Sequence, residues 1–345
     1  MELLAPAGSF ESLKAAVQSG ADAVYIGGSK FSARRSAGNF TIDEIKSAVE
    51  YCHLRSTAVH VAANILVKEK EKDEFLEYMG KLCDAGVDAV IIQDIGMAAK
   101  THMLYPDLPL HASTQMTAAS VDAVKFLENA GFSRVVLARE LSKEAIEKIC
   151  RETTAEIEVF AHGAICMCYS GQCLMSSIIG GRSGNRGMCA QPGRLPYKID
   201  GDTKYHLSPK DLCMVNNLHE LENMGVASIK IEGRLKRSEY VATVCGIYRK
   251  YMDSGKPISS EDYAELLNAF NRSGFTSGYY DGKIGSKMMS FENPSNISEN
   301  TFSHDVIERC REDANFRKNK IYISASLRKN TPFSVTVWDD FGHCA

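Results

Sequence analysis

Four cysteines in irregular, glycine-rich sequence are the residues of this chain best suited to metal or redox chemistry. Cys166 and Cys173 lie in HGAICMCYSGQC, Cys189 lies in RGMCAQPG, and Cys213 ends LSPKDLC. Packing of an apolar core gives no reason for thiols in such segments. Four thiolates around one point select zinc or an iron–sulfur cluster. The sequence therefore indicates a metal centre, provided that the fold gathers these segments.

The spacing of the thiols leaves several chemistries open. Six, fifteen and twenty-three residues separate the four cysteines, and the short CxxC pairs of structural zinc sites are absent. Wide spacing favours a larger cluster that separate loops hold. The alternatives are zinc, a nucleophilic or redox thiol paired with His162, and a purely structural role. Cys168 is a fifth candidate ligand, because spacing alone does not exclude it.

Composition and charge narrow the class of protein. The chain has 345 residues, 44% hydrophobic and 24% charged, and a net charge of −3, so any basic surface for nucleic acid must be local. It has no apolar run of the roughly 18 residues that a membrane span needs. The start, MELLAPAGSF, lacks the features of a signal peptide. Eleven cysteines without an export signal predict a reducing cytoplasm.

Strands and helices alternate along residues 1–237. Four segments resemble one another: SGADAVYIGG, AGVDAVIIQD, AGFSRVVLAR and MGVASIKIEG, each with a glycine where a helix ends and then a short apolar strand. Four more strand candidates are ELLAPAG, STAVHVAANILV, LPLHASTQM and EIEVFAHG. This alternation predicts a closed (β/α)8 barrel of the TIM type. A doubly wound open sheet is the alternative, disfavoured because no GxGxxG turn follows the first strand.

Polar residues recur at the carboxyl ends of the predicted strands, where barrels of this type carry their chemistry. We therefore predict a polar pocket there. The seventh strand leads into a long cysteine-rich insertion, residues 163–213, which places the thiols at the mouth of the pocket. Arg139 and His162 are expected to line the pocket, and Glu232 and Arg234 to orient a ligand or its neighbouring side chains.

The remaining sequence predicts two C-terminal parts. Residues 238–318 are typical of a helical and loop extension packed on the barrel. Residues 319–345 alternate like antiparallel strands and end just after a turn signal, WDDFG. We expect this segment to be the beginning of a truncated β domain, with a small terminal hairpin as the alternative.

A family resemblance becomes clear at these residues. The blocks ELLAPAGSFESLKAAVQSGADAVYIG, NRGMCAQPGR, LSPKDLC, IKIEGRLKR and FNRSGFTSGYYDG resemble recurring blocks of the collagenase-like peptidases, peptidase family U32, over residues 1 to about 290. The family's signature pattern is matched at Glu158, Phe160, Gly163, Ala164, Ile165, Cys166, Gly171, Cys173 and Ser176.

The resemblance implies two different activities. The family name implies a collagenase-like protease, yet similar proteins hydroxylate RNA bases or a quinone precursor without molecular oxygen, with a [4Fe–4S] cluster and prephenate as oxygen donor. Long members resemble the enzyme that forms 5-hydroxycytidine in 23S rRNA, and shorter ones modify a tRNA uridine. Gly193 stands where a further cysteine is common. The resemblance assigns the cluster to Cys166, Cys173, Cys189 and Cys213.

The sequence favours the hydroxylase. It has neither HExxH nor GxSxG, so no hydrolytic constellation is evident. A hydroxylase acting on RNA needs a redox centre, a cationic pocket for a small anionic oxygen donor, and a basic rim for phosphates. The expected RNA contacts are Arg182, Arg186, Arg194, Lys198, Lys236 and Arg237, together with Lys30, Arg34 and Arg35 after the second strand.

Overall fold

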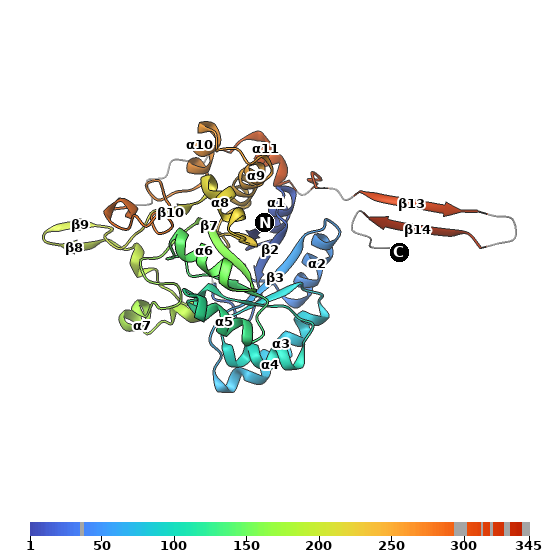
Figure 1. Cartoon of the computed structure of the whole chain (residues 1–345), viewed down its shortest axis with the longest axis horizontal. Coiled ribbons are helices and arrows are strands. Elements are labelled where there is room, and N and C mark those ends of the chain that lie inside the picture. Colours follow the sequence, from blue (N-terminus) through green and yellow to red (C-terminus); the bar gives the residue numbers. More distant parts are fainter. Residues whose placement is uncertain (35–37, 293–301, 312, 318–319, 328–331, 340–345) are drawn as a thin grey trace.

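The computed structural model describes residues 1–34, 38–292, 302–311, 313–317, 320–327 and 332–339. Within these ranges eight parallel strands close into a barrel with helices on its outer side (Figure 1). The last barrel strand pairs with both the first and the seventh, which closes the ring and confirms the predicted fold. The strands are β1 (Glu2–Pro6), β2 (Ala23–Gly27), β3 (Ala58–Ala63), β4 (Ala89–Ile92), β5 (Leu110–Ala112), β6 (Arg134–Val136), β7 (Glu156–Gly163) and β11 (Ser228–Ile231).

Helices follow the strands because their apolar residues recur at helical spacing and face the barrel. In the first helix Leu13, Ala16 and Val17 are fully buried, and the Ser9 side chain caps the first turn by accepting from the Ser12 backbone N–H. The barrel helices are α1 (Phe10–Gln18), α2 (Ile42–His53), α3 (Lys72–Asp84), α4 (Ile95–Leu104), α5 (Val121–Asn129), α6 (Lys143–Glu152), α8 (Leu218–Asn223) and α9 (Ser238–Ser254).

Paired charges fill the N-terminal half of the barrel interior. Arg134 donates to Glu2 at 2.5 Å and to Glu156 at 2.7 Å, and Lys230 donates to Glu158 at 2.8 Å. Glu158 is fully buried, and Arg134 and Lys230 are nearly so. Ionised groups at such depth are tolerated only when they are paired. This network of ion pairs fills the barrel interior below the cavity. Lys230 belongs to the network and also lines the cavity at the carboxyl ends of the strands.

The connection after β7 is long and builds its own substructure; we call residues 163–213 the cysteine loop. It contains α7 (Met175–Gly180) and a projecting hairpin of β8 (Tyr197–Ile199) and β9 (Asp202–Lys204) (Figure 1). β10 (Asp211–Cys213) returns antiparallel to β7, and β12 (Phe275–Thr276) pairs with β10. The 3-10 turns are η1 (Glu69–Glu71), η2 (Thr114–Met116), η3 (Gly184–Arg186), η4 (Pro192–Arg194), η5 (Val215–Asn217) and η6 (Ser286–Met288).

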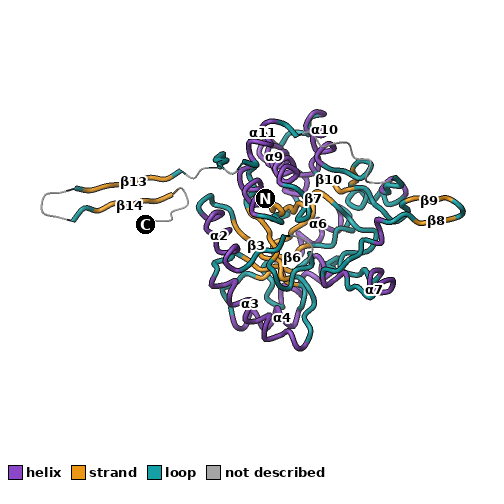
Figure 2. The backbone as a smooth tube through the Cα atoms, turned by 180° about the vertical axis from the view of Figure 1, so that it is seen from behind, coloured by secondary structure: helices purple, strands orange, loops and turns teal. Residues whose placement is uncertain are grey.

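The C-terminal part adds two helices beside α9 and a hairpin that extends away from the barrel (Figure 2). The helices are α10 (Ser260–Ala269) and α11 (His304–Arg309). The hairpin pairs β13 (Ile321–Ser326) with β14 (Ser334–Asp339) in the antiparallel sense. A further β domain beginning at residues 319–345 stays a prediction, since residues 319, 328–331 and 340–345 lie outside the described ranges. No described helix combines the length and apolarity that crossing a membrane requires.

Candidate active site

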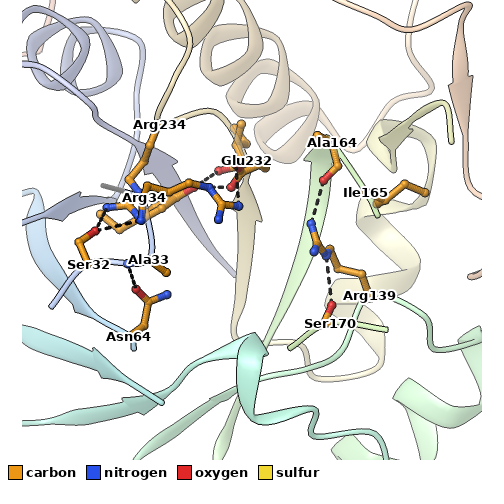
Figure 3. A network of polar contacts seen from close by, with 12 residues as sticks. Ser32, Ala33, Arg34, Asn64, Arg139, Ala164, Ile165, Ser170, Glu232 and Arg234 are labelled. Carbon is orange, nitrogen blue, oxygen red and sulfur yellow. Dashed lines mark hydrogen bonds and ion pairs between the residues drawn. The ribbon is translucent and has the colours of Figure 1, made fainter. Parts of the chain in front are cut away.

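A cavity opens at the carboxyl ends of the barrel strands, where this fold places active sites. It is narrow, with a volume of about 50 Å³. Figure 3 shows that Arg34 and Glu232, which come from segments far apart in the sequence, point toward one another, and that Arg234 reaches Ser32. The lining residues are Tyr25, Arg34, Ala62, Asn64, Ile91, Ser113, Thr114, Gln115, Val136, Phe160, Lys230, Glu232 and Arg234.

Glu232 is the acidic group of this cavity. Its carboxylate pairs with Arg34 at 3.4 Å and accepts a hydrogen bond of 3.3 Å from the Tyr25 hydroxyl. Burial by itself raises the pKa of a carboxyl group, but the guanidinium groups of Arg34, Arg139 and Arg234 outweigh burial here and lower the pKa of Glu232. Glu232 is therefore ionised at neutral pH and holds Arg34 against the cavity wall.

Arg234 is a buried cation that forms no ion pair with any described residue. It is 5% exposed, and its guanidinium donates to the Ser32 hydroxyl at 3.1 Å (Figure 3). Burial lowers the pKa of Arg234 to about 10, which leaves it charged at neutral pH. Lys230 differs, because Glu158 neutralises it from below. The cavity thus carries a positive charge that a carboxylate ligand would complement.

Two glycines make room for Arg234. A Cβ on Gly27 would overlap the Arg234 guanidinium, and a Cβ on Gly8 would overlap the Arg234 carbonyl oxygen. Neither glycine has a positive φ, so close approach of Arg234 is what requires glycine at both positions. The chain after β1 is therefore shaped around the backbone of Arg234, and the end of β2 around its side chain.

We expect Gly27→Ala to displace the Arg234 guanidinium and to weaken carboxylate binding about tenfold, the effect of losing one charge-assisted hydrogen bond. Calorimetric titration with prephenate, the donor expected from the sequence, measures the change. Gly246→Ala in α9 is the matched control, since a Cβ there meets nothing within 4 Å and alanine favours a helix. Unchanged affinity in Gly27→Ala would show that Arg234 does not contact the ligand.

His162 does not line the cavity, and our prediction for it was wrong in this respect. Its ring lies beneath α9, with centroids 5.5 Å from the Tyr248 ring and 5.2 Å from the Phe275 ring. Its Nδ1 lies 3.3 Å from the Tyr248 hydroxyl. Burial lowers the pKa of His162 to about 3, so the imidazole is neutral at physiological pH. This position and charge suit a packing role.

A bulge in β7 explains the position of His162. Along β11, Lys230 is paired with Phe160 and the next residue, Ile231, is paired with His162, which leaves Ala161 as an extra residue. Regular alternation from Phe160 would point His162 into the barrel, but one extra residue reverses the side on which the following side chain lies.

Arg139 lies at the rim of the cavity and holds the beginning of the cysteine loop. Its guanidinium donates to the Ala164 carbonyl at 2.8 Å and to the Ser170 hydroxyl at 3.3 Å (Figure 3). The same group lies 5.2 Å from the centre of the Phe160 ring, which lines the cavity. The prediction that Arg139 lines the pocket is therefore corrected to a position behind Phe160, from which its charge still acts on Glu232.

Three thiols of the cysteine loop are neighbours. Burial, and then the adjacent Cys173 and Cys166 groups, raise the pKa of Cys168. Cys189 lies against the same segment, because a Cβ on Gly184 would meet the Cys189 Cβ at 3.7 Å and the Cys173 carbonyl oxygen at 3.9 Å. The folded loop therefore brings Cys166, Cys168, Cys173 and Cys189 into one region, although they are spread over two dozen positions of the sequence.

Cys213 approaches from β10. Its backbone pairs with His162 on β7, and its sulfur lies 3.8 Å from the Tyr248 hydroxyl. The cysteines of the described ranges are all free. No group of three His, Cys, Asp or Glu side chains in those ranges surrounds one point as metal ligands would. The predicted ligands fit a cluster in donor chemistry, but in the described residues their side chains do not form a closed ligand shell.

The cysteine loop rests directly on the cavity wall. The Thr117 hydroxyl donates to the Ser170 carbonyl at 2.7 Å and accepts from the Gln172 side chain at 2.7 Å. Gly171, between these two partners, approaches the Gln115 carbonyl so closely that no side chain would fit. Since Gln115 lines the cavity, the thiol-bearing segment and the cavity share this contact.

Four of the six basic residues assigned to RNA contact other parts of the protein, although one of them, Arg182, donates to the Met188 carbonyl at 3.1 Å while staying exposed. Arg186 pairs with Glu71 at 2.8 Å, and Arg194 donates to two backbone carbonyls and a hydroxyl at the base of the cysteine loop. Lys236 lies over the Phe270 ring, and burial lowers the pKa of Lys236 to about 7. The exposed members are Arg182, Lys198 and Arg237, while Arg35 lies outside the described residues.

Sequence reasoning missed several cavity residues. Tyr25, Phe160 and Lys230 were not among the predicted site residues, and Arg34 was assigned to the basic rim. The alternation of strand side chains could have identified two of them. Tyr25 shares the inner face of β2 with Gly27, and Phe160 follows the inward-facing Glu158 by two residues. The aromatic residues of the cavity wall therefore lie within strands β2 and β7 and not in the loops that follow the strands.

The fold and the site define a (β/α)8 barrel protein with a thiol-rich loop beside a cation-lined cavity. The chain belongs to peptidase family U32, whose family profile matches residues 8–290. This match confirms the resemblance that the sequence blocks indicated.

Curated relatives carry names of two kinds. The chain is 38% identical to "tRNA hydroxylation protein P1" of Bacillus subtilis, over 82% of this chain and 72% of the relative. It is 41% identical to "23S rRNA 5-hydroxycytidine C2501 synthase" of Escherichia coli, over 74% of this chain but only 39% of that longer protein. It is 34% identical to "Collagenase" of Porphyromonas gingivalis, over 82% of this chain and 74% of the relative.

Proposed function

We propose that this chain is an RNA hydroxylase of the cytoplasm that inserts oxygen into a base of 23S rRNA (a cytidine) or of tRNA (a uridine) without molecular oxygen. The names of two similar proteins support the reaction class. The observation that carries the proposal is the contact between the thiol-bearing loop and the cation-lined cavity, where Gly171 lies against Gln115. The proposed redox centre and the anion site would thereby be adjacent.

The charges that line the cavity suit a small anionic oxygen donor such as prephenate, which has carboxylates and a hydroxyl group. Arg234 would pair with a carboxylate, Arg34 is held nearby by Glu232, and Asn64 and Ser113 offer neutral hydrogen bonds to a hydroxyl. In net terms a C–H bond of the base becomes C–OH while the C–OH bond of the donor becomes C–H. The base is oxidised and the donor reduced by equal numbers of electrons, so no further oxidant is needed.

A [4Fe–4S] cluster held by Cys166, Cys173, Cys189 and Cys213 would supply electron transfer to this reaction. All four thiols are free and belong to residues 163–213, which supports the assignment. The chain's own contribution is to fix the loop: Arg139 anchors its first residues through the Ala164 carbonyl, and Thr117 anchors its middle through Ser170. Arg139 lies behind Phe160 of the cavity wall, and Thr117 follows the cavity residue Gln115 by two positions, so these anchors would keep donor and redox centre in a constant relation.

The family's alternative activity, proteolysis, receives less support. Cys213 and His162 are neighbours in paired strands, yet burial raises the pKa of Cys213 and lowers that of His162. A nucleophilic thiolate and its base require the opposite shifts. A peptidase would also cleave denatured collagen or casein and lose that activity when Cys166 or His162 is replaced by alanine.

Mass mapping of 23S rRNA and tRNA from cells with and without the gene tests the proposal. We expect one fragment to lose the mass of an oxygen atom in the deletion strain and to regain it when the gene is restored. The Arg234→Met variant serves as the inactive complement and should leave the fragment unmodified. Identical RNA masses in both strains, together with cleavage of casein by the purified chain, would favour the peptidase.

A further inference from the structure

A groove lies beside the cavity on the same face of the barrel, and nothing above uses it. It encloses about 500 Å³, within the range of small-ligand sites, and lies between the ends of β4 and β5 and helix α5. Its walls are largely apolar, and Leu66 and Phe126 are 48% and 61% exposed. Gln115 lines both the groove and the cavity, so the two hollows share a wall.

Two side-chain amide oxygens among the residues that line the groove have no hydrogen-bond partner in the described structure. Gln93 is 7% exposed, and its Oε1 is buried with no partner among the described residues. The Oε1 of Gln115 is in the same state. A buried amide left unpaired is costly, and natural proteins rarely keep one. Two at one groove therefore indicate a ligand that presents hydrogen-bonding groups along an edge.

The charges of the two hollows differ. Asp94 is the charged residue that lines the groove, and its carboxylate oxygens accept from the Met97 and Val67 backbone N–H groups at 3.0 Å each. No described cation lines the groove, whereas Arg34, Lys230 and Arg234 line the cavity. A phosphate or carboxylate would be repelled from the groove and attracted to the cavity. The groove suits a neutral, flat ligand with a polar edge.

We propose that the groove holds the target pyrimidine base of the RNA while the cavity beside it holds the anionic oxygen donor; this inference rests on the proposed function. The Phe126 ring offers a surface on which an unstacked base packs. A glutamine amide has a carbonyl acceptor and an NH₂ donor, so rotation lets Gln93 and Gln115 pair with the N4 amino group of cytosine or the O4 of uracil. The base would then lie across Gln115 from the donor, next to Gly171 of the cysteine loop.

Photo-crosslinking locates the base without requiring the reaction. Short single-stranded RNAs with one 5-iodocytidine or 5-iodouridine are irradiated with the full chain, without donor, and the crosslinked peptides are sequenced. We expect crosslinks in residues 93–97 and 115–127, and about tenfold weaker RNA binding in Phe126→Ala, as for other lost base-stacking contacts. Leu54→Ala is the control, because Leu54 is 73% exposed on the surface but does not line the groove.

The outcomes separate the two proposals. If the chain hydroxylates RNA but crosslinks only outside the groove, or if Phe126→Ala binds and crosslinks as Leu54→Ala does, the groove assignment is overturned and the proposed function stands. If the chain neither binds nor modifies RNA, both fail. Gln93→Leu is a second variant, which keeps the side-chain volume but removes the amide, and it should lose the crosslink while denaturant unfolding remains cooperative.

Discussion

Serine in place of Cys173 is expected to abolish iron binding and RNA hydroxylation together. If the proposed cluster is present, the native chain purified without air should contain about four iron atoms and absorb visible light, since this is the composition of a [4Fe–4S] cluster. A serine hydroxyl is a hard, weakly acidic ligand that does not replace a thiolate. Iron and sulfide analysis of the variant should give values near zero. Hydroxylation, measured by mass mapping, should fall below detection.

Two further cysteine variants make this result specific. Cys83→Ser is the control, because Cys83 is exposed on α3 and lies outside the cysteine loop, so iron content should stay at the native level. The Cys168→Ser variant tests whether Cys168, the neighbour of Cys166 and Cys173, is itself a ligand of the cluster. Zinc in place of iron in the native chain, or full iron in the Cys173 variant, would refute the proposed ligand set.

Methionine in place of Arg234 is expected to weaken binding of the anionic donor by about 10- to 100-fold. A hydrogen bond to a charged group contributes roughly 1.5–3 kcal/mol, and each 1.4 kcal/mol is a factor of ten in affinity. Arg234 has no carboxylate partner among the described residues, so its full charge is available to a ligand. Methionine keeps most of the volume. Calorimetric titration with prephenate measures the loss.

The control for charge is Arg237→Met, three residues further along the chain. Arg237 is exposed and does not line the cavity, so the same substitution there should leave donor affinity unchanged. Arg234→Lys should recover part of the affinity, because it restores the charge but not the fork of donors. Equal losses in Arg234→Met and Arg237→Met would mean that long-range charge, and not contact in the cavity, attracts the donor.

The sequence by itself determined the barrel and the place of its chemistry. Apolar strands such as AVYIG and SIKI alternate with helices whose buried residues recur at helical spacing, and only parallel pairing with helical crossovers satisfies both patterns. The long insertion after EIEVFAHG was visible as sequence that neither pattern explains. Glu232 and Arg234 were identifiable because they follow the last barrel strand directly, where this fold exposes side chains to the cavity.

Only the tertiary structure decided which side chains meet. One extra residue at Ala161 turned His162 out of the barrel, and such a bulge depends on pairing with β11, which lies almost seventy positions further along the chain. Arg194 and Lys236 looked like free cations until the folded chain supplied carbonyl and aromatic partners. The local sequence pattern determines on which side of a strand a residue lies. Partners distant in the sequence determine what that residue contacts, and these contacts decide the chemistry of the site.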